Sequence, residues 1–194
     1  MLGRKLFSKE VVMKNVVPKK PVRGFTLIEL LMVLAIGAGL LFGVFVAVSK
    51  VQSKALVKEA AENLNLMVAE TRAKYKAQGN FTGVSPQVLI NNRIPPQQMI
   101  QGNNIVDPWN QNIAVAPTNV NNPNDAVRFT YPAVPRDDCS NFVQAAEGAF
   151  GRVIVGATVV KNLYANPPVP LNVGTLGTAC SADATVAISF DQMR

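Results

Sequence analysis

The residue with the clearest chemical demand is Glu29, a carboxylate at the start of an apolar run. No charged residue follows it between Leu30 and Val48, and about 20 apolar residues suffice for a helix to cross a membrane. An ionised side chain there costs about 2.5–3.5 kcal/mol and usually marks function. Cleavage between Gly24 and Phe25 would create an α-amino group four residues upstream of Glu29. Because a helix N-terminus is already positive, the Glu29 of a neighbouring subunit would neutralise that amine better, which predicts charges satisfied only in an assembly.

Catalytic and metal chemistry have little support in the sequence. It contains no histidine, which removes the commonest general base and metal ligand. The adjacent carboxylates Asp137 and Asp138 suit the first turn of a helix, where the dipole favours acids, better than a metal site. Asp183 and Asp191 are too sparse to argue a calcium site. We therefore expect a protein that is not an enzyme, with no catalytic residues, no metal site and no cofactor.

The positive charge is concentrated before the apolar run. The chain carries a formal net charge of +7, and residues 1–24 hold seven basic residues and one acidic residue, which leaves 12 basic and 11 acidic side chains elsewhere. This asymmetry predicts a cytoplasmic basic segment and an external remainder. Direct nucleic-acid binding by the rest of the chain is therefore not expected.

Two cysteines, Cys139 and Cys180, follow the apolar run on the predicted external side. Because that side is oxidising, we interpret them as a disulfide. Closing a loop of about 40 residues would stabilise the fold by roughly 4 kcal/mol in the chain-entropy model. The alternative is a pair of buried free thiols.

The segment Gly24-Phe-Thr-Leu-Ile-Glu29, with its basic leader and apolar sequel, resembles the class III signal of type IV prepilins and related pseudopilins. In that family a prepilin peptidase cuts after the glycine and methylates the new N-terminus, and the glutamate is needed for assembly. The resemblance implies cleavage between Gly24 and Phe25, N-methylation of Phe25 and an assembly role for Glu29. The alternatives are an ordinary membrane anchor and a secretory signal peptide cut after Ser49.

One continuous helix is expected to carry these residues, because no proline occurs from Phe25 to about Gln78. Its first half, residues 25–50, is the apolar segment, which the resemblance makes transmembrane and later fibre-core. Its second half, residues 51–78, is amphipathic and needs a partner, for which a C-terminal sheet is the candidate. The apolar stripe consists of Val57, Ala60, Ala61, Leu64, Met67, Val68, Thr71 and Tyr75.

The remaining residues, 79–194, read as a globular head with short strands. A connecting region with a short helix after Ser85-Pro86 precedes a turn at Asp107–Asn112, in which Trp109 is interpreted as a packing residue. We expect strands at 113–116, 126–131 and 184–190, one or two strands within 152–161, a helix opening at Pro135 and closing at Gly151, and a loop over 162–178.

These elements resemble the type IV pilin fold, an α+β architecture with a long N-terminal helix, membrane-spanning in its first half, packed on an antiparallel β-sheet head. The resemblance divides the chain into a cleaved leader (1–24), two helix halves (25–50 and 51–78) and a head (79–194) with a disulfide-bounded region (139–180). A cysteine opening a helix and a second before the last strand are similar to the type IVb subgroup. Within it, the pilins of conjugative thin pili and of enteric adhesion pili look most similar.

The resemblance implies a major pilin, the structural subunit of a type IV pilus. Its expected partners are further copies in a helical fibre, the prepilin peptidase, the inner-membrane assembly machinery and the membrane. The expected location is the bacterial inner membrane, single-pass with the C-terminus outside, and then an extracellular fibre for adhesion, aggregation, motility or conjugative mating-pair formation. The alternatives are a minor pilin or type II secretion pseudopilin, and a monomeric bitopic membrane protein with a ligand-binding outer domain.

Overall fold

The computed structural model describes Gly24 and residues 26–194, with the backbone alone at residues 43, 45–47, 49 and 50. The predicted leader, apart from Gly24, and the predicted cleavage and methylation residue Phe25 lie outside the described residues. The chain divides into two units, the first ending at Val44 and the second beginning at Phe45.

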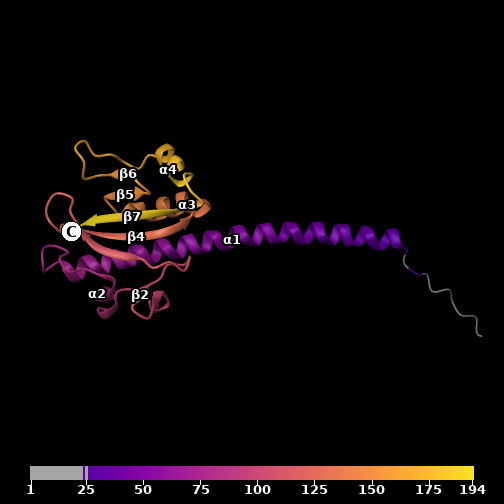
Figure 1. Cartoon of the computed structure of the whole chain (residues 1–194), viewed down its shortest axis with the longest axis horizontal. Helices are drawn as coiled ribbons and strands as arrows, with labels where there is room; N and C mark the ends of the chain where they lie inside the picture. The colour runs from indigo at the N-terminus through magenta and orange to yellow at the C-terminus, as the bar shows by residue number, and fades with distance from the viewer. Residues whose placement is uncertain (1–23, 25) are drawn as a thin grey trace, which may run out of the picture. The chain divides into compact units, whose positions relative to one another are not determined.

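The first element is the helix α1 (Leu27–Tyr75), which runs through the unit boundary without a break (Figure 1). The predicted continuous helix is therefore present, but it ends at Tyr75 and not at Gln78. Residues 76–78 form a turn, in which the N–H groups of Gln78 and Gly79 both donate to the Tyr75 carbonyl. Gly79 has a φ of +84°, which glycine adopts without a steric penalty. Among the described residues, no helix is both long enough and apolar enough to cross a membrane.

The second unit is built on a five-stranded antiparallel sheet with the order β3-β4-β7-β5-β6. The last strand in the sequence, β7 (Thr185–Met193), is central, between β4 (Ala126–Pro135) and β5 (Arg152–Val155). The edges are β3 (Ala114–Thr118) and β6 (Thr158–Asn162). All the strands expected from the alternating patterns are present, and several are longer than predicted.

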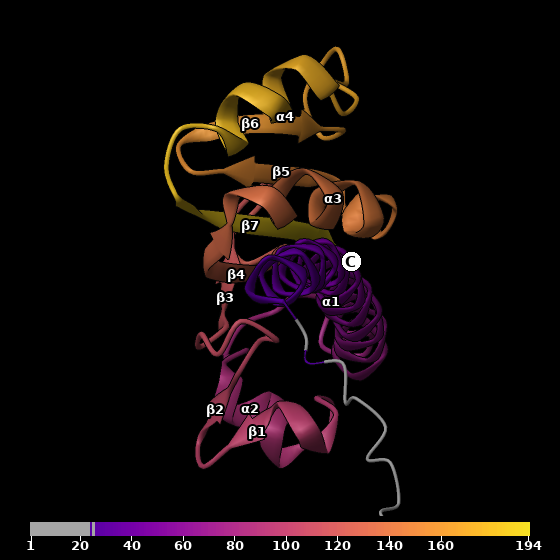
Figure 2. The same cartoon turned by 90° about the vertical axis from the view of Figure 1, so that its right-hand side faces the viewer.

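The core of the second unit lies between the sheet, α1 and α3 (Arg136–Ala146). Figures 1 and 2 show the second part of α1 running alongside β4. Every residue of the predicted apolar stripe of α1, from Val57 to Tyr75, is buried. Aromatic rings join the layers with edge-to-face geometry, such as Tyr131 with Phe142 at 4.8 Å and Phe142 with Phe190 at 5.3 Å between centroids, an arrangement that aromatic pairs favour.

The connecting region holds α2 (Pro86–Asn91), a 3-10 turn η1 (Gln97–Met99) and a hairpin of β1 (Ile100–Gln101) and β2 (Asn104–Ile105). The predicted N-cap is confirmed, since the side chain of Ser85 accepts a hydrogen bond from the N–H of Val88. A second 3-10 turn, η2 (Glu147–Ala149), follows α3.

The predicted loop over 162–178 is wrong in its last part, because Val173–Cys180 forms the helix α4. Asn172 caps this helix by accepting a hydrogen bond from the N–H of Thr175. Gly174 and Gly177 lower the intrinsic helix propensity, but Leu176 is fully buried, and this tertiary packing outweighs the local preference. The helix α4 lies beside β6 (Figure 2).

Candidate assembly sites

The start of α1 is a side-chain cap built from the signal motif itself. The N–H of Glu29 donates to the hydroxyl of Thr26 at 3.3 Å, and the N–H of Leu30 donates to the Thr26 carbonyl at 3.1 Å. Threonine followed three residues later by glutamate is the capping-box pattern. The sequence contained this signal, and the capping role of Thr26 was missed. The cap places the carboxylate of Glu29 in the first helical turn, where the dipole favours an acid.

Glu29 is also exposed, like Gly24 before it. Among the described residues, no cation forms an ion pair with its carboxylate. The side chain is therefore accessible to a group from another molecule.

The first unit exposes an extended apolar surface on α1. Leu27 is 76% exposed, Leu41 74% and Phe42 71%. Contiguous apolar surface of this kind marks an interface with a protein or a membrane. The other large apolar side chains exposed in this unit are Ile28, Leu30, Leu31, Met32, Val33, Leu34, Ile36, Leu40 and Val44.

The predicted disulfide between Cys139 and Cys180 is present, with 5.7 Å between the Cα atoms. Cys139 is the fourth residue of α3 and Cys180 is the last residue of α4, so the bond joins these two helices. Both side chains are buried. The disulfide therefore fixes the segment that leads into the central strand β7.

A polar contact ties α1 to the head. The buried carboxylate of Asp138 accepts hydrogen bonds from the hydroxyl of Ser53 on α1 and from the indole N–H of Trp109 at 2.9 Å. Both Asp137 and Asp138 lie in the first turn of α3, as the helix-start interpretation predicted. Asp138 has a further role that the interpretation did not include, because its buried carboxylate links three parts of the head. Trp109 also packs edge-to-face on Phe142 at 5.4 Å, which confirms its predicted packing role.

A second buried carboxylate, Asp191 on β7, lies between two arginines on neighbouring strands. It faces Arg128 on β4 and Arg152 on β5 in register. Arg128 donates at 2.6 and 2.8 Å and Arg152 at 2.6 Å, and the hydrogen bonds with Asp191 raise the pKa of Arg128. This cluster could not be predicted from the sequence, because it depends on the order of the strands in the sheet.

A third buried carboxylate, Asp107, is only partly satisfied. Its Oδ1 accepts hydrogen bonds from the N–H groups of Trp109 and Gln111 at 2.9 and 2.8 Å. Its Oδ2 is buried and has no hydrogen-bond partner among the described residues. Burial raises the pKa of Asp107, although the two backbone hydrogen bonds oppose the rise.

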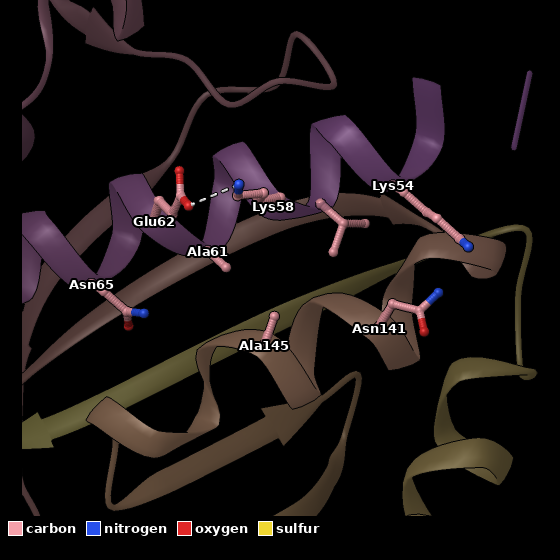
Figure 3. Close-up of a pocket in the computed structure, with 8 residues that line it drawn as sticks. Lys54, Lys58, Ala61, Glu62, Asn65, Asn141 and Ala145 are labelled. Atoms are coloured by element: carbon pink, nitrogen blue, oxygen red, sulfur yellow. Dashed lines mark ion pairs between the residues drawn. The ribbon is translucent and has the colours of Figure 1, made fainter. Parts of the chain in front are cut away.

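The groove shown in Figure 3 lies between α1 and α3, with a volume of about 370 Å³. Ala61 and Ala145 face each other across it, and Lys58 and Glu62 form an ion pair at 3.7 Å. Both partners of this pair are exposed, so it adds little stability. Among the described residues, no group of three or more His, Cys, Asp or Glu side chains could hold a metal ion. The groove offers a contact surface with no nucleophile–base pair.

These features define a type IV prepilin: a capped N-terminal signal helix continues into a helix packed on an antiparallel sheet, and a disulfide closes the region before the last strand. The chain belongs to the family described as PilS N terminal, whose model matches residues 54–191. Residues 19–47 match the prokaryotic N-terminal methylation motif. The predicted family and fold class are therefore confirmed.

Two solved structures show the same fold. The chain is similar to TcpA, a type IV pilin from Vibrio cholerae El Tor biotype, with 16% identity and a TM-score of 0.56, over 71% of this chain and 99% of that one. It is also similar to a type IV b pilin from Salmonella typhi, with 14% identity and a TM-score of 0.54, over 70% of this chain and 99% of that one. A search of curated proteins found no match.

Proposed function

We propose that this protein is a major pilin, which polymerises through its N-terminal helix into a type IV pilus. The observation that carries the proposal is the exposed apolar surface of the first unit, which lies within the residues that match the methylation motif. Such a surface needs a cover of lipid before assembly and of neighbouring helices afterwards. In this proposal residues 1–24 are the leader, residues 25–50 cross the inner membrane and then line the fibre core, and the head lies outside.

Three residues carry the assembly step in this proposal. The peptidase cuts after Gly24, and the new N-terminus at Phe25 is methylated. The carboxylate of Glu29, which has no cation beside it among the described residues, then pairs with the amine of a neighbouring subunit. This pairing removes two uncompensated charges from an apolar environment, where each is costly.

The first experiment is the intact mass of the protein in a sheared cell-surface fraction. The expected mass lacks residues 1–24, gains one methyl group and has lost two hydrogens to the disulfide. A protein that begins near residue 50 would identify an ordinary secreted protein. Full-length protein confined to the membrane of a cell with a working prepilin peptidase would identify a simple anchor. Either of these results would overturn the proposal.

Substitution of Glu29 separates charge from helix capping. Glu29→Gln retains a residue that a capping box accepts but removes the charge, and Glu29→Ala and Glu29→Val remove both. All three variants should be inserted and cleaved yet be absent from fibres. Thr26→Ala is the matched control, because it removes the cap and keeps the carboxylate, and it should still polymerise. Normal fibres from Glu29→Gln would refute the charge-pairing step.

A minor pilin or a secretion pseudopilin would have the same kind of N-terminal region. Abundance decides between them, since a major pilin forms most of the protein in purified fibres. We propose a surface fibre that acts in adhesion, aggregation, motility or conjugative mating-pair formation, and loss of each behaviour in a strain lacking the protein assigns the role.

A further inference from the structure

Most of the exposed charges of α1 in the second unit fall on two flanks, with Glu62 and Lys74 as the exceptions. At about 100° per residue, Lys54, Lys58 and Arg72 point within about 40° of one another, and Lys76 follows in the turn directly after the helix. Glu59 and Glu70 point about 130° further around the helix. All six side chains are exposed. Glu62 pairs with Lys58 on the basic side, and Lys74 points about 50° away from the two glutamates. Apart from these two residues, the helix presents one basic flank and one acidic flank on either side of its buried face.

A cavity of about 230 Å³ lies on the acidic flank, and we call it the acidic pocket. Its charged wall residues are Glu59 on α1 and Asp107 in the turn after β2. Asp107 is 4% exposed, and its Oδ2 has no hydrogen-bond partner among residues 26–194. A carboxylate oxygen without a hydrogen-bond partner is unfavourable in a buried place, and the charged residues that line this pocket are both acidic.

A cavity of about 410 Å³ lies on the basic flank, near the end of α1, and we call it the basic pocket. It is lined by Ala69, Arg72, Ala73, Lys76 and Arg194. None of its three cations has an ion-pair partner in the described part of the chain. The charged residues that line this pocket are therefore all basic.

We propose that the basic pocket of one pilin docks on the acidic pocket of the next copy in the fibre. This inference rests on the proposed function, because it needs a polymer that brings heads together. Arg72 lies 13 residues after Glu59, about 20 Å along the helix axis. The contact therefore joins two different surfaces that are offset along the helix. Such a heterologous contact propagates as an open filament when the rotation between copies does not close a ring.

A second copy of this chain accounts for both pockets, whereas an unrelated anion would account for the basic pocket alone. An anion would leave the acidic pocket unsatisfied, whereas one repeated contact satisfies both. Exposed ion pairs such as that of Lys58 with Glu62 contribute little to stability. Asp107 is buried, and an ion pair is stronger at an interface from which water is excluded. Complementary charge also fixes the register of the heads and rejects wrong orientations.

The test uses the full-length chain in cells that assemble the fibre, with charge reversals made singly and together. Lys76→Glu and Glu59→Lys should each lower the sheared fibre fraction at least about tenfold, because like charges at an interface cost several kcal/mol and about 1.4 kcal/mol is a factor of ten. The double variant should recover most of the fibre. Lys54→Glu is the matched control, with the same charge change on the same flank outside the basic pocket, and it should behave like the parent protein.

Two further readouts separate the possible failures. Cleavage of the leader and formation of the Cys139–Cys180 disulfide report insertion and folding in every variant, and both should be normal. If the parent protein is absent from fibres, the proposed function itself is wrong. If the parent forms fibres but the single reversals have no effect, or the double variant is not rescued, the docking is wrong. Loss from Lys76→Glu alone would assign the basic pocket to an anionic partner, and equal loss from Lys54→Glu would implicate net charge; both results overturn the docking.

Discussion

Replacing Asp191 by asparagine should destabilise the head by about 3 kcal/mol. Asp191 is 0% exposed and accepts three short hydrogen bonds from Arg128 and Arg152. Removing one partner of a buried ion pair costs about 3–5 kcal/mol, because a charge is left uncompensated. The two arginine side chains are 33% and 19% exposed, so they can still reach water, which places the loss at the lower end of that range.

The assay is denaturant unfolding of the processed protein, residues 25–194, in detergent and with the disulfide intact. Thr130→Val is the matched control, since Thr130 faces Ser189 on the same pair of strands with a single hydroxyl contact at 3.0 Å. That variant should lose only about 1 kcal/mol. A loss of less than about 1 kcal/mol from Asp191→Asn would refute the reasoning, because the arginines would then be compensated elsewhere.

Two further predictions concern the disulfide and the unpaired carboxylate. Replacing both Cys139 and Cys180 by alanine should lower the free energy of unfolding by about 4 kcal/mol, since the bond spans 41 residues, and denaturant unfolding measures the loss. Asp107→Asn should raise the melting temperature at pH 7 while reducing fibre yield. Burial raises the pKa of Asp107 above its ordinary 3.8, so the folded head binds this proton more tightly than the unfolded chain and loses stability as pH rises through that pKa. Melting curves from about pH 4 to pH 7 should show this loss for the parent and not for the variant; equal slopes would contradict it.

The parts of the chain with a regular apolar repeat or a local helix-start signal were predictable from sequence. The apolar stripe of α1 repeats every three to four residues, and all its members are buried, because a helix can bury only one face against a sheet. Ser85-Pro86 marked the start of α2 for an equally local reason, since it supplies the cap and a residue with a fixed φ.

Features that depend on contacts between distant residues were not predictable. The helix α4 has two glycines, and its stability depends on buried Leu176 and the disulfide, not on propensity. The roles of Asp138 and Asp191 require knowledge of what lies opposite them. Asp191 meets Arg128 from 63 residues away, and this meeting follows from β7 lying centrally in the sheet.

The carboxylates of this protein fall into two groups: those with donors in the same chain and those without. Asp191 and Asp138 are buried with donors on neighbouring elements, so they stabilise one head. Glu29 and the Oδ2 of Asp107 have no cation or donor among the described residues. Because an unpaired carboxylate is costly in an apolar setting, we propose that another copy supplies the missing positive charge to these two groups in the fibre. In this proposal the same physical demand acts at the helix start and at the head, and polymerisation satisfies both groups.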